Sequence, residues 1–190
     1  MQTHQNMTLA DMDFVVGENF RSSIWQPILF LGAPGTGKSM YSRRKLPILM
    51  ADHYGVDVDD IGFAEEKPAR RDAAELAGAA LPQNLEDGFV QAVRKYAPST
   101  GKHTFEFTPP PLWLNVMRQY LAGKTYGIIL IEEIAAAGQA EQKVMRDLTD
   151  PEEHSIGGFR FPATWIVVLN GNRAKAVSYT HLTLPTTPYV

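Results

Sequence analysis

The sequence of 190 residues contains no cysteine, which excludes disulfides, thiolate metal sites and cysteine nucleophiles. The lack of cysteine also points towards a reducing, intracellular setting. No serine lies in a nucleophile-elbow pattern. No pair of histidines has a metal-ligand spacing such as i, i+4, so we predict no zinc or iron site. The histidines are His4, His53, His103, His154 and His181.

Long apolar runs and a strong excess of one charge are missing as well. No apolar run approaches the length of a membrane span, and the first residues lack the basic and apolar regions of a signal peptide. The formal net charge is −3, which gives no sign of a basic nucleic-acid surface. Length and composition fit one globular domain with a core. We expect a cytoplasmic protein with no membrane partner and find no clear nucleic-acid signal; a local basic patch is the alternative.

A glycine-rich stretch at residues 32–39 fits the phosphate-binding loop pattern G-x-x-x-x-G-K-[ST]. It follows the apolar run 28–31, which is typical of a short buried strand, and precedes residues that can begin a helix. Strand, loop and helix in this order are the context that confirms the motif. The alternative is a glycine-rich turn with an exposed lysine. The loop residues are Gly32, Ala33, Pro34, Gly35, Thr36, Gly37, Lys38 and Ser39.

These residue types suit a triphosphate, which crowds several negative charges together. Glycines let backbone N–H groups approach the phosphates closely, and the N-terminus of a helix adds positive potential. Lys38 can reach the β- and γ-phosphates, and the hydroxyl of Ser39 can hold Mg²⁺. We predict that residues 32–39, together with Met40, bind the nucleotide.

Apolar strands alternating with helices predict an α/β fold, a mainly parallel sheet with helices on both faces. Residues 1–23 are read as a loose segment or a short helix. Pro47 should kink the first helix after the loop or end it early. Ligands of such sheets bind at the carboxyl ends of the strands. Strands are expected at 27–31, 61–64, 104–108, 127–131 and 164–169, helices at 38–51, 85–96, 111–122 and 139–149, and a hairpin at 155–162.

The three prolines at 109–111 have two interpretations. A polyproline segment can serve as a ligand for a partner protein, and a proline can also occupy the first turn of a helix. We favour the second, because Leu112, Val116 and Tyr120 continue at helical spacing.

Two carboxylates and two amides follow apolar strands. Glu132 and Glu133 directly follow the apolar run 127–131. The carboxylate of Glu132 can bind Mg²⁺, and that of Glu133 can position or deprotonate the attacking water. Asn170 and Asn172 follow the next strand, and either amide can hold that water or the γ-phosphate. The alternatives are a solvated acidic strand end and ordinary turn asparagines.

Together these features resemble the AAA+ ATPase family, and within it the MoxR-like branch. The resemblance covers roughly residues 27–175. Residues 32–39 look like the Walker A loop, and residues 128–133 look like Walker B. Asn172 looks like the sensor-1 residue, and the hairpin at 155–161 stands where this branch carries one before the sensor strand.

This resemblance implies a ring-forming, usually hexameric ATPase that remodels client proteins or helps to insert metal cofactors into them. Its ligands would be ATP and Mg²⁺. Lys38, Glu133 and Asn172 would be the catalytic residues, with Glu133 polarising water and Asn172 sensing the γ-phosphate. Ser39 and Glu132 would hold the metal. A protein with a metal-binding von Willebrand-type domain would be a partner.

The chain departs from the family pattern in two places. Glu132 stands where Walker B usually has aspartate, and its extra methylene shifts the carboxylate outward. The family's fifth core strand, arginine finger and helical lid are not identifiable. Residues 177–190 contain no Asp, Glu, Lys or Arg, and their first part resembles a translated sequencing adapter. We expect a lead-in at 1–26, a partial ATPase core at 27–176 and a non-native tail at 177–190; a genuine disordered or strand-like tail is the alternative.

Two other functions fit parts of the pattern. A non-catalytic nucleotide-binding module, or an inactive fragment, would use the loop without turnover, since hydrolysis should be poor without a lid and an arginine finger. A missing fifth strand would also leave the first strand beside an open edge and expose apolar surface. A phosphate-loop kinase fits less well, because it calls neither for Glu133 nor for the hairpin before Asn172.

Overall fold

Four parallel strands form the centre of the molecule in the computed structural model, which describes residues 8–22, 26–78, 87–96 and 109–172. The predicted strand at 104–108 and the tail at 177–190 lie outside the described residues. Strands β1, β6, β3 and β2 lie side by side in that order, and every pair is parallel. This confirms the predicted α/β class. Their bounds are β1 Ile28–Gly32, β2 Gly62–Glu66, β3 Gly127–Ile131 and β6 Trp165–Asn172.

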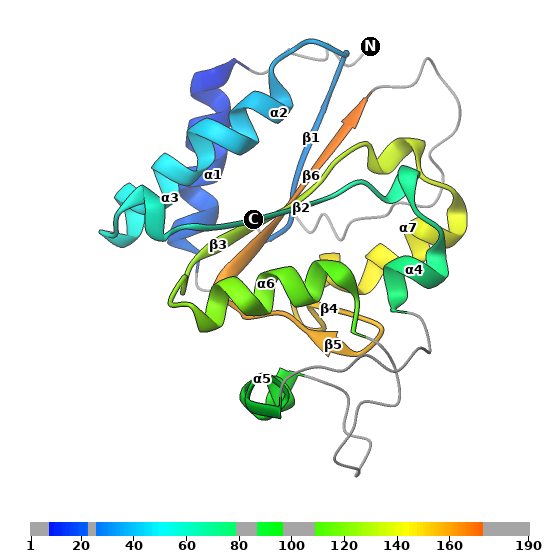
Figure 1. The fold of residues 1–190 in the computed structure, drawn as a ribbon. Helices are drawn as coiled ribbons and strands as arrows, with labels where there is room; N and C mark the ends of the chain where they lie inside the picture. Colours follow the sequence, from blue (N-terminus) through cyan, green and yellow to red (C-terminus); the bar gives the residue numbers. More distant parts are fainter. Residues whose placement is uncertain (1–7, 23–25, 79–86, 97–108, 173–190) are drawn as a thin grey trace.

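Helices α1 (Leu9–Arg21) and α3 (Leu46–Tyr54) cover one face of the sheet (Figure 1). Of the two predicted alternatives for residues 1–23, a loose segment or a short helix, the described residues 9–21 form the helix α1. Thr8 and Asp11 form a reciprocal capping box at its start. The helix then buries residues four apart against the strands, as an amphipathic helix does. These residues are Met12, Val16 and Phe20.

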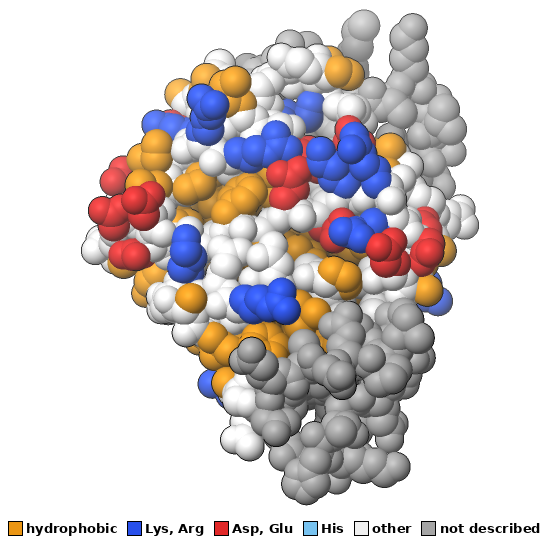
Figure 2. Space-filling view, in the orientation of Figure 1, with side chains coloured by type: hydrophobic (Ala, Val, Ile, Leu, Met, Phe, Trp, Pro, Cys, Tyr) orange, Lys and Arg blue, Asp and Glu red, His pale blue; other side chains and the backbone are white. Residues whose placement is uncertain are grey.

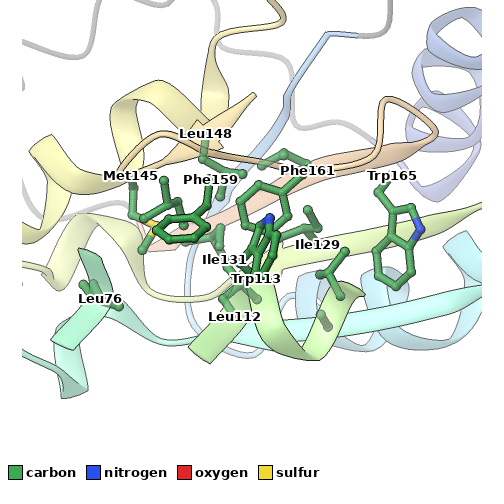
Figure 3. Packing of buried hydrophobic residues seen from close by; sticks show 14 of the residues in the cluster. Leu76, Leu112, Trp113, Ile129, Ile131, Met145, Leu148, Phe159, Phe161 and Trp165 are labelled. Carbon is green, nitrogen blue, oxygen red and sulfur yellow. The ribbon is translucent and has the colours of Figure 1, made fainter. Parts of the chain in front are cut away.

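The opposite face carries helices and the predicted hairpin around a core of large side chains (Figure 3). Trp113 and Phe159 meet edge to face at 5.1 Å between ring centroids, and the Trp113 indole N–H donates to the carbonyl of Arg160 at 2.7 Å. Helix α6 and the hairpin are therefore joined in the core. The elements are α4 Ala73–Ala77, α6 Pro111–Leu121, α7 Gln139–Arg146, β4 Ser155–Ile156 and β5 Phe159–Arg160, and α5 (Asp87–Val93) adds Val93 to the same core.

Prolines 109–111 lead into α6, which confirms the helix-start interpretation. Pro111 is the first residue of the helix, where its missing N–H costs no hydrogen bond. Pro109 and Pro110 are buried, so they do not present a polyproline surface to a partner.

The helix after the glycine loop runs past Pro47, and the prediction of an early stop there is wrong. It consists of α2 (Lys38–Met40), a π-helical turn (Tyr41–Lys45) and α3. In the π turn the N–H of Leu46 bonds to the carbonyl of Tyr41, so the irregularity comes before the proline. Pro47 then lies in the first turn of α3, where proline is tolerated.

Strand β6 extends beyond its predicted end at residue 169. Phe30 pairs with Asn170 and Gly32 pairs with Asn172, so both asparagines belong to the strand rather than to a turn. The register therefore brings the asparagines beside the end of β1.

None of the described helices has the length and apolar character needed to cross a membrane.

Candidate functional site

A cavity of about 400 Å³ opens at the carboxyl ends of β1, β3 and β6. Of the predicted site residues, Gly32 and Ala33 are not among the lining residues; their backbone carbonyls accept hydrogen bonds from Lys38, and the others line the cavity. The fold thus brings together the glycine loop, both carboxylates and both asparagines. The lining residues are Pro34, Gly35, Thr36, Gly37, Lys38, Ser39, Met40, Glu132, Glu133, Asn170 and Asn172.

The loop needs its glycines for backbone geometry. Gly35 and Gly37 have φ of 80° and 87°, in the left-handed region that side chains disfavour. Gly37 is the N-cap of the helix that follows. A Cβ at Gly32 would lie 3.1 Å from the hydroxyl oxygen of Thr36, so a side chain there would press on the loop.

Lys38 folds back over the loop. Its ammonium group donates to the carbonyls of Gly32 (3.0 Å) and Ala33 (2.9 Å), and it lies 3.3 Å from both the Thr36 hydroxyl and the Asn172 side-chain oxygen. All four acceptors are neutral, and no carboxylate of the described residues forms an ion pair with Lys38. The loop therefore keeps an uncompensated positive charge, which suits a phosphate.

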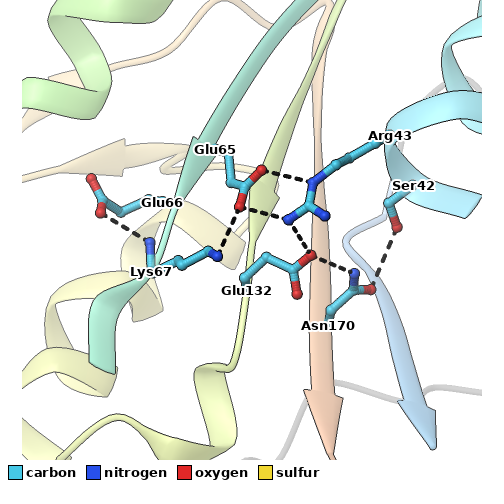
Figure 4. A network of polar contacts seen from close by, with 7 residues as sticks. All are labelled: Ser42, Arg43, Glu65, Glu66, Lys67, Glu132 and Asn170. Atoms are coloured by element: carbon cyan, nitrogen blue, oxygen red, sulfur yellow. Dashed lines mark hydrogen bonds and ion pairs between the residues drawn. The ribbon is translucent and has the colours of Figure 1, made fainter. Parts of the chain in front are cut away.

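Glu132 is buried, with 5% of its surface exposed, and its charge is held by two donors (Figure 4). One carboxylate oxygen, Oε1, accepts from Arg43 Nη2 at 3.1 Å and from Asn170 Nδ2 at 3.3 Å. Asn170 is itself buried, and its oxygen accepts from the Ser42 hydroxyl at 3.5 Å. A buried carboxylate requires such partners, since desolvation alone would disfavour its charge.

Arg43 also binds Glu65 on β2. Its Nε and Nη2 donate to the two carboxylate oxygens at 2.9 and 2.8 Å, a two-point contact. Hydrogen bonding to Arg43 lowers the pKa of Glu65, and the same contact raises the pKa of Arg43. Sequence reasoning missed Ser42, Arg43 and Glu65, because nothing in the basic run after the loop indicates which strand ends it meets.

Glu133 takes a different environment from its neighbour. Its backbone lies in the left-handed region, at φ 56° and ψ 30°, which is uncommon for a residue with a side chain. The side chain is half-buried and lines the cavity, and no group of the described residues hydrogen-bonds to its carboxylate. The pair therefore diverges: Glu132 joins a buried network and Glu133 is left available.

The residues present fit a magnesium ion. The Ser39 hydroxyl and the Glu132 carboxylate line the same cavity and are the hard oxygen ligands that Mg²⁺ prefers. The second oxygen of Glu132 has no hydrogen bond from the described residues. In the described part of the chain, no group of three or more acidic, histidine or cysteine side chains is arranged to hold a metal ion, so the protein would share the ion with phosphate oxygens, as is usual for Mg²⁺.

The chain matches no protein-family profile and no curated protein. Solved structures with a partial likeness include the S. cerevisiae Hsp104–ADP complex, at 17% identity and a TM-score of 0.47. That likeness covers 86% of this chain and 24% of the Hsp104 chain. A closed-state reconstruction of Hsp104 with ATPγS and FITC casein is 19% identical, with a TM-score of 0.39, and the likeness covers 77% of this chain and 21% of that one. The chain thus spans less than a quarter of the length of these solved chains.

Proposed function

We propose that the chain binds ATP with Mg²⁺ and hydrolyses it, as the core of an AAA+ ATPase. One observation carries the proposal: the cavity joins a cationic glycine loop to two carboxylates and two amides at neighbouring strand ends. A ligand that is anionic at one side and metal-bound at the other fits both halves of this cavity.

The loop half would bind phosphate. Lys38 already lies above the loop carbonyls, and a phosphate would offer its ammonium group charged acceptors in place of the neutral ones. Backbone N–H groups from Gly35 to Ser39 would add donors at the start of the helix. Asn172 lies within reach of Lys38 and has amide donors for the γ-phosphate or the attacking water.

The strand-end half would carry the metal and the water. Ser39 and Glu132 would hold Mg²⁺, which when bound neutralises charge that develops on the phosphate oxygens. Glu133 would polarise the attacking water, since its carboxylate faces the cavity without a competing donor among the described residues. Asn170 would keep Glu132 in place rather than contact the nucleotide.

A nucleotide-binding module without turnover is the second candidate. The contact between Arg43 and Glu132 favours it, because a carboxylate that is already neutralised is a weaker ligand for a metal.

We further propose that the chain belongs to the MoxR-like branch of the AAA+ ATPases. The hairpin β4–β5, directly before β6, supports this assignment. A homo-oligomeric ring, a client protein and a von Willebrand-type partner follow from that assignment. Size-exclusion chromatography with light scattering, with and without ATP, tests the ring: assembly on ATP supports it, and a monomer at all ATP concentrations counts against it.

Replacing Lys38 with alanine tests the binding step. Loss of its charge-assisted contacts should weaken ATP binding by about 10²-fold or more, measured by isothermal titration calorimetry. The substitution should leave the fold intact, because the Nζ contacts lie at the cavity rather than in the core. Unchanged affinity in Lys38→Ala would contradict the proposed role of the loop, and Lys45→Ala, an exposed lysine outside the cavity, is the matched control.

A further inference from the structure

One arginine bridges carboxylates from two neighbouring strands (Figure 4). Arg43 contacts Glu132, at the end of β3, through Nη2 at 3.1 Å. It contacts Glu65, on β2, through both Nε and Nη2 at 2.9 and 2.8 Å. The same guanidinium group is therefore shared between a residue of the cavity and a residue beside it.

The two contacts differ in strength and setting. The contact with Glu65 is two-pronged, whereas the contact with Glu132 uses a single donor. The side chain of Glu65 is 26% exposed, and that of Glu132 is 7% exposed. Glu65 can thus hold Arg43 in place without help from Glu132, while the buried Glu132 depends on the charge of Arg43.

The helix geometry directs these contacts towards the strand ends. Ser42 and Arg43 are adjacent in the π-helical turn, and both reach the Glu132–Asn170 pair. Short π-helical segments inside helices often occur at functional sites. Arg44, the next residue, is exposed and forms no ion pair with the described residues.

We infer that Arg43 is a positioning residue that serves as the counter-ion of Glu132 in the ligand-free chain. When Glu132 binds a divalent cation, Glu65 keeps Arg43 in place. This inference rests on the proposed nucleotide function. A carboxylate that accepts a hydrogen bond from a guanidinium group is a weaker ligand for a metal, so Arg43 weakens the coupling between magnesium and nucleotide binding. Glu65 draws Arg43 away from Glu132 and strengthens that coupling.

Binding of ADP with and without magnesium tests the inference. The readout is the ratio of the dissociation constant in EDTA to that in Mg²⁺, measured by calorimetry. Any direct attraction between Arg43 and the phosphates would affect both constants and largely cancel in this ratio. Arg43→Met should raise the ratio about two- to fivefold, the range of a partly exposed ion pair, and Glu65→Gln should lower it by a similar factor. The double variant should behave like Arg43→Met, because Glu65 acts only through Arg43.

Arg44→Met is the matched control and should keep the wild-type ratio. A ratio that is unchanged or lowered in Arg43→Met, or raised in Glu65→Gln, overturns the inference. If the folded wild-type chain binds no ADP in either condition, the proposed function itself fails. ADP binding with equal ratios in every variant leaves the proposed function in place and rejects only the role of Arg43.

Discussion

The two sides of the cavity are built in different ways. On the loop side, three of the four acceptors of Lys38 lie two to six positions away in the chain, and the fourth, Asn172, lies 134 positions away. On the strand-end side, Glu132 bonds to residues 38 and 89 positions away, and Asn170 bonds to Ser42 across 128 positions. The contacts of the loop are mostly local in the chain, whereas the strand-end network forms only when the strands of the sheet come together.

The two sides also carry opposite charge. The loop side carries the ammonium group of the half-buried Lys38 with its neutral acceptors, and the strand-end side places one buried carboxylate and one half-buried carboxylate beside it. From this difference we expect the loop to bind the phosphates, and the strand ends to hold the metal and the attacking water. Substitutions should therefore have separable effects on binding, turnover and stability.

The largest effect should come from Glu133. Glu133→Gln keeps the shape of the side chain and removes its basicity, so turnover should fall by about 10² to 10⁴, the range for loss of a general base. Nucleotide affinity and thermal stability should stay close to wild type, because no described group bonds to this carboxylate. Phosphate release at saturating ATP measures the change.

The matched control for Glu133 is Glu152→Gln, an exposed acid outside the cavity, which should hydrolyse ATP at the wild-type rate. Normal turnover in Glu133→Gln would place the catalytic base elsewhere. Absence of turnover in the wild-type chain, with ATP bound, would favour the non-catalytic module instead.

A smaller effect should separate the two asparagines. Asn170→Ala removes a buried donor to Glu132 and an acceptor for Ser42, so it should destabilise the fold by about 1–3 kcal/mol. Asn172 is exposed and bonds to Lys38, so Asn172→Ala should change stability by less than about 0.5 kcal/mol and affect turnover instead. Urea denaturation measures the first quantity.

The reverse pattern, with Asn172 needed for stability and Asn170 for turnover, would contradict the division between the two sides. Equal effects of both substitutions on stability would show that the cavity forms one energetic unit.

Much of this arrangement could be predicted from the sequence, and the exceptions share a physical cause. The glycine loop, the strand before it and the strand that ends directly before Glu132 are contiguous patterns of residue types, and the structure contains each of them. The network around Arg43 could not be predicted, because its members come from different elements and meet only through the parallel register. Apolar periodicity fixes which face of a strand is buried, but not which polar side chains its end meets.

The local irregularities follow the same rule. Pro47 predicted an irregularity in the helix after the loop, but the sequence did not predict a π-helical turn directly before α3. Nor did it predict that Ser42 and Arg43, which lie in this turn, would contact residues at the strand ends. Asn170 and Asn172 belong to β6 because β1 pairs with them, which composition alone does not reveal.

The smallest predicted effect concerns acid stability on the strand-end side. Hydrogen bonding to Arg43 lowers the pKa of Glu65 below its ordinary value of 4.5. The stabilisation by this contact is therefore fully present above pH 4.5 and is lost as the pH falls through the lowered pKa. The free energy of unfolding of wild type should exceed that of Glu65→Gln by about 0.5 kcal/mol at neutral pH, as for a partly exposed pair.

This advantage over Glu65→Gln should shrink as the pH falls below 4.5, because the glutamine variant has no carboxylate to protonate at this position. Parallel urea titrations at neutral and acidic pH measure the difference. An advantage that grows on acidification would contradict the role of the Arg43–Glu65 contact.

The most direct test asks whether one ligand engages both sides of the cavity. Backbone amide spectra of the isotope-labelled chain, recorded by nuclear magnetic resonance, would follow the addition of ADP with Mg²⁺. Signals of the loop, 34–40, and of the strand ends, 132–133 and 170–172, should shift together with one dissociation constant. Shifts confined to the loop, or absent from both sides, would contradict a single nucleotide–magnesium site.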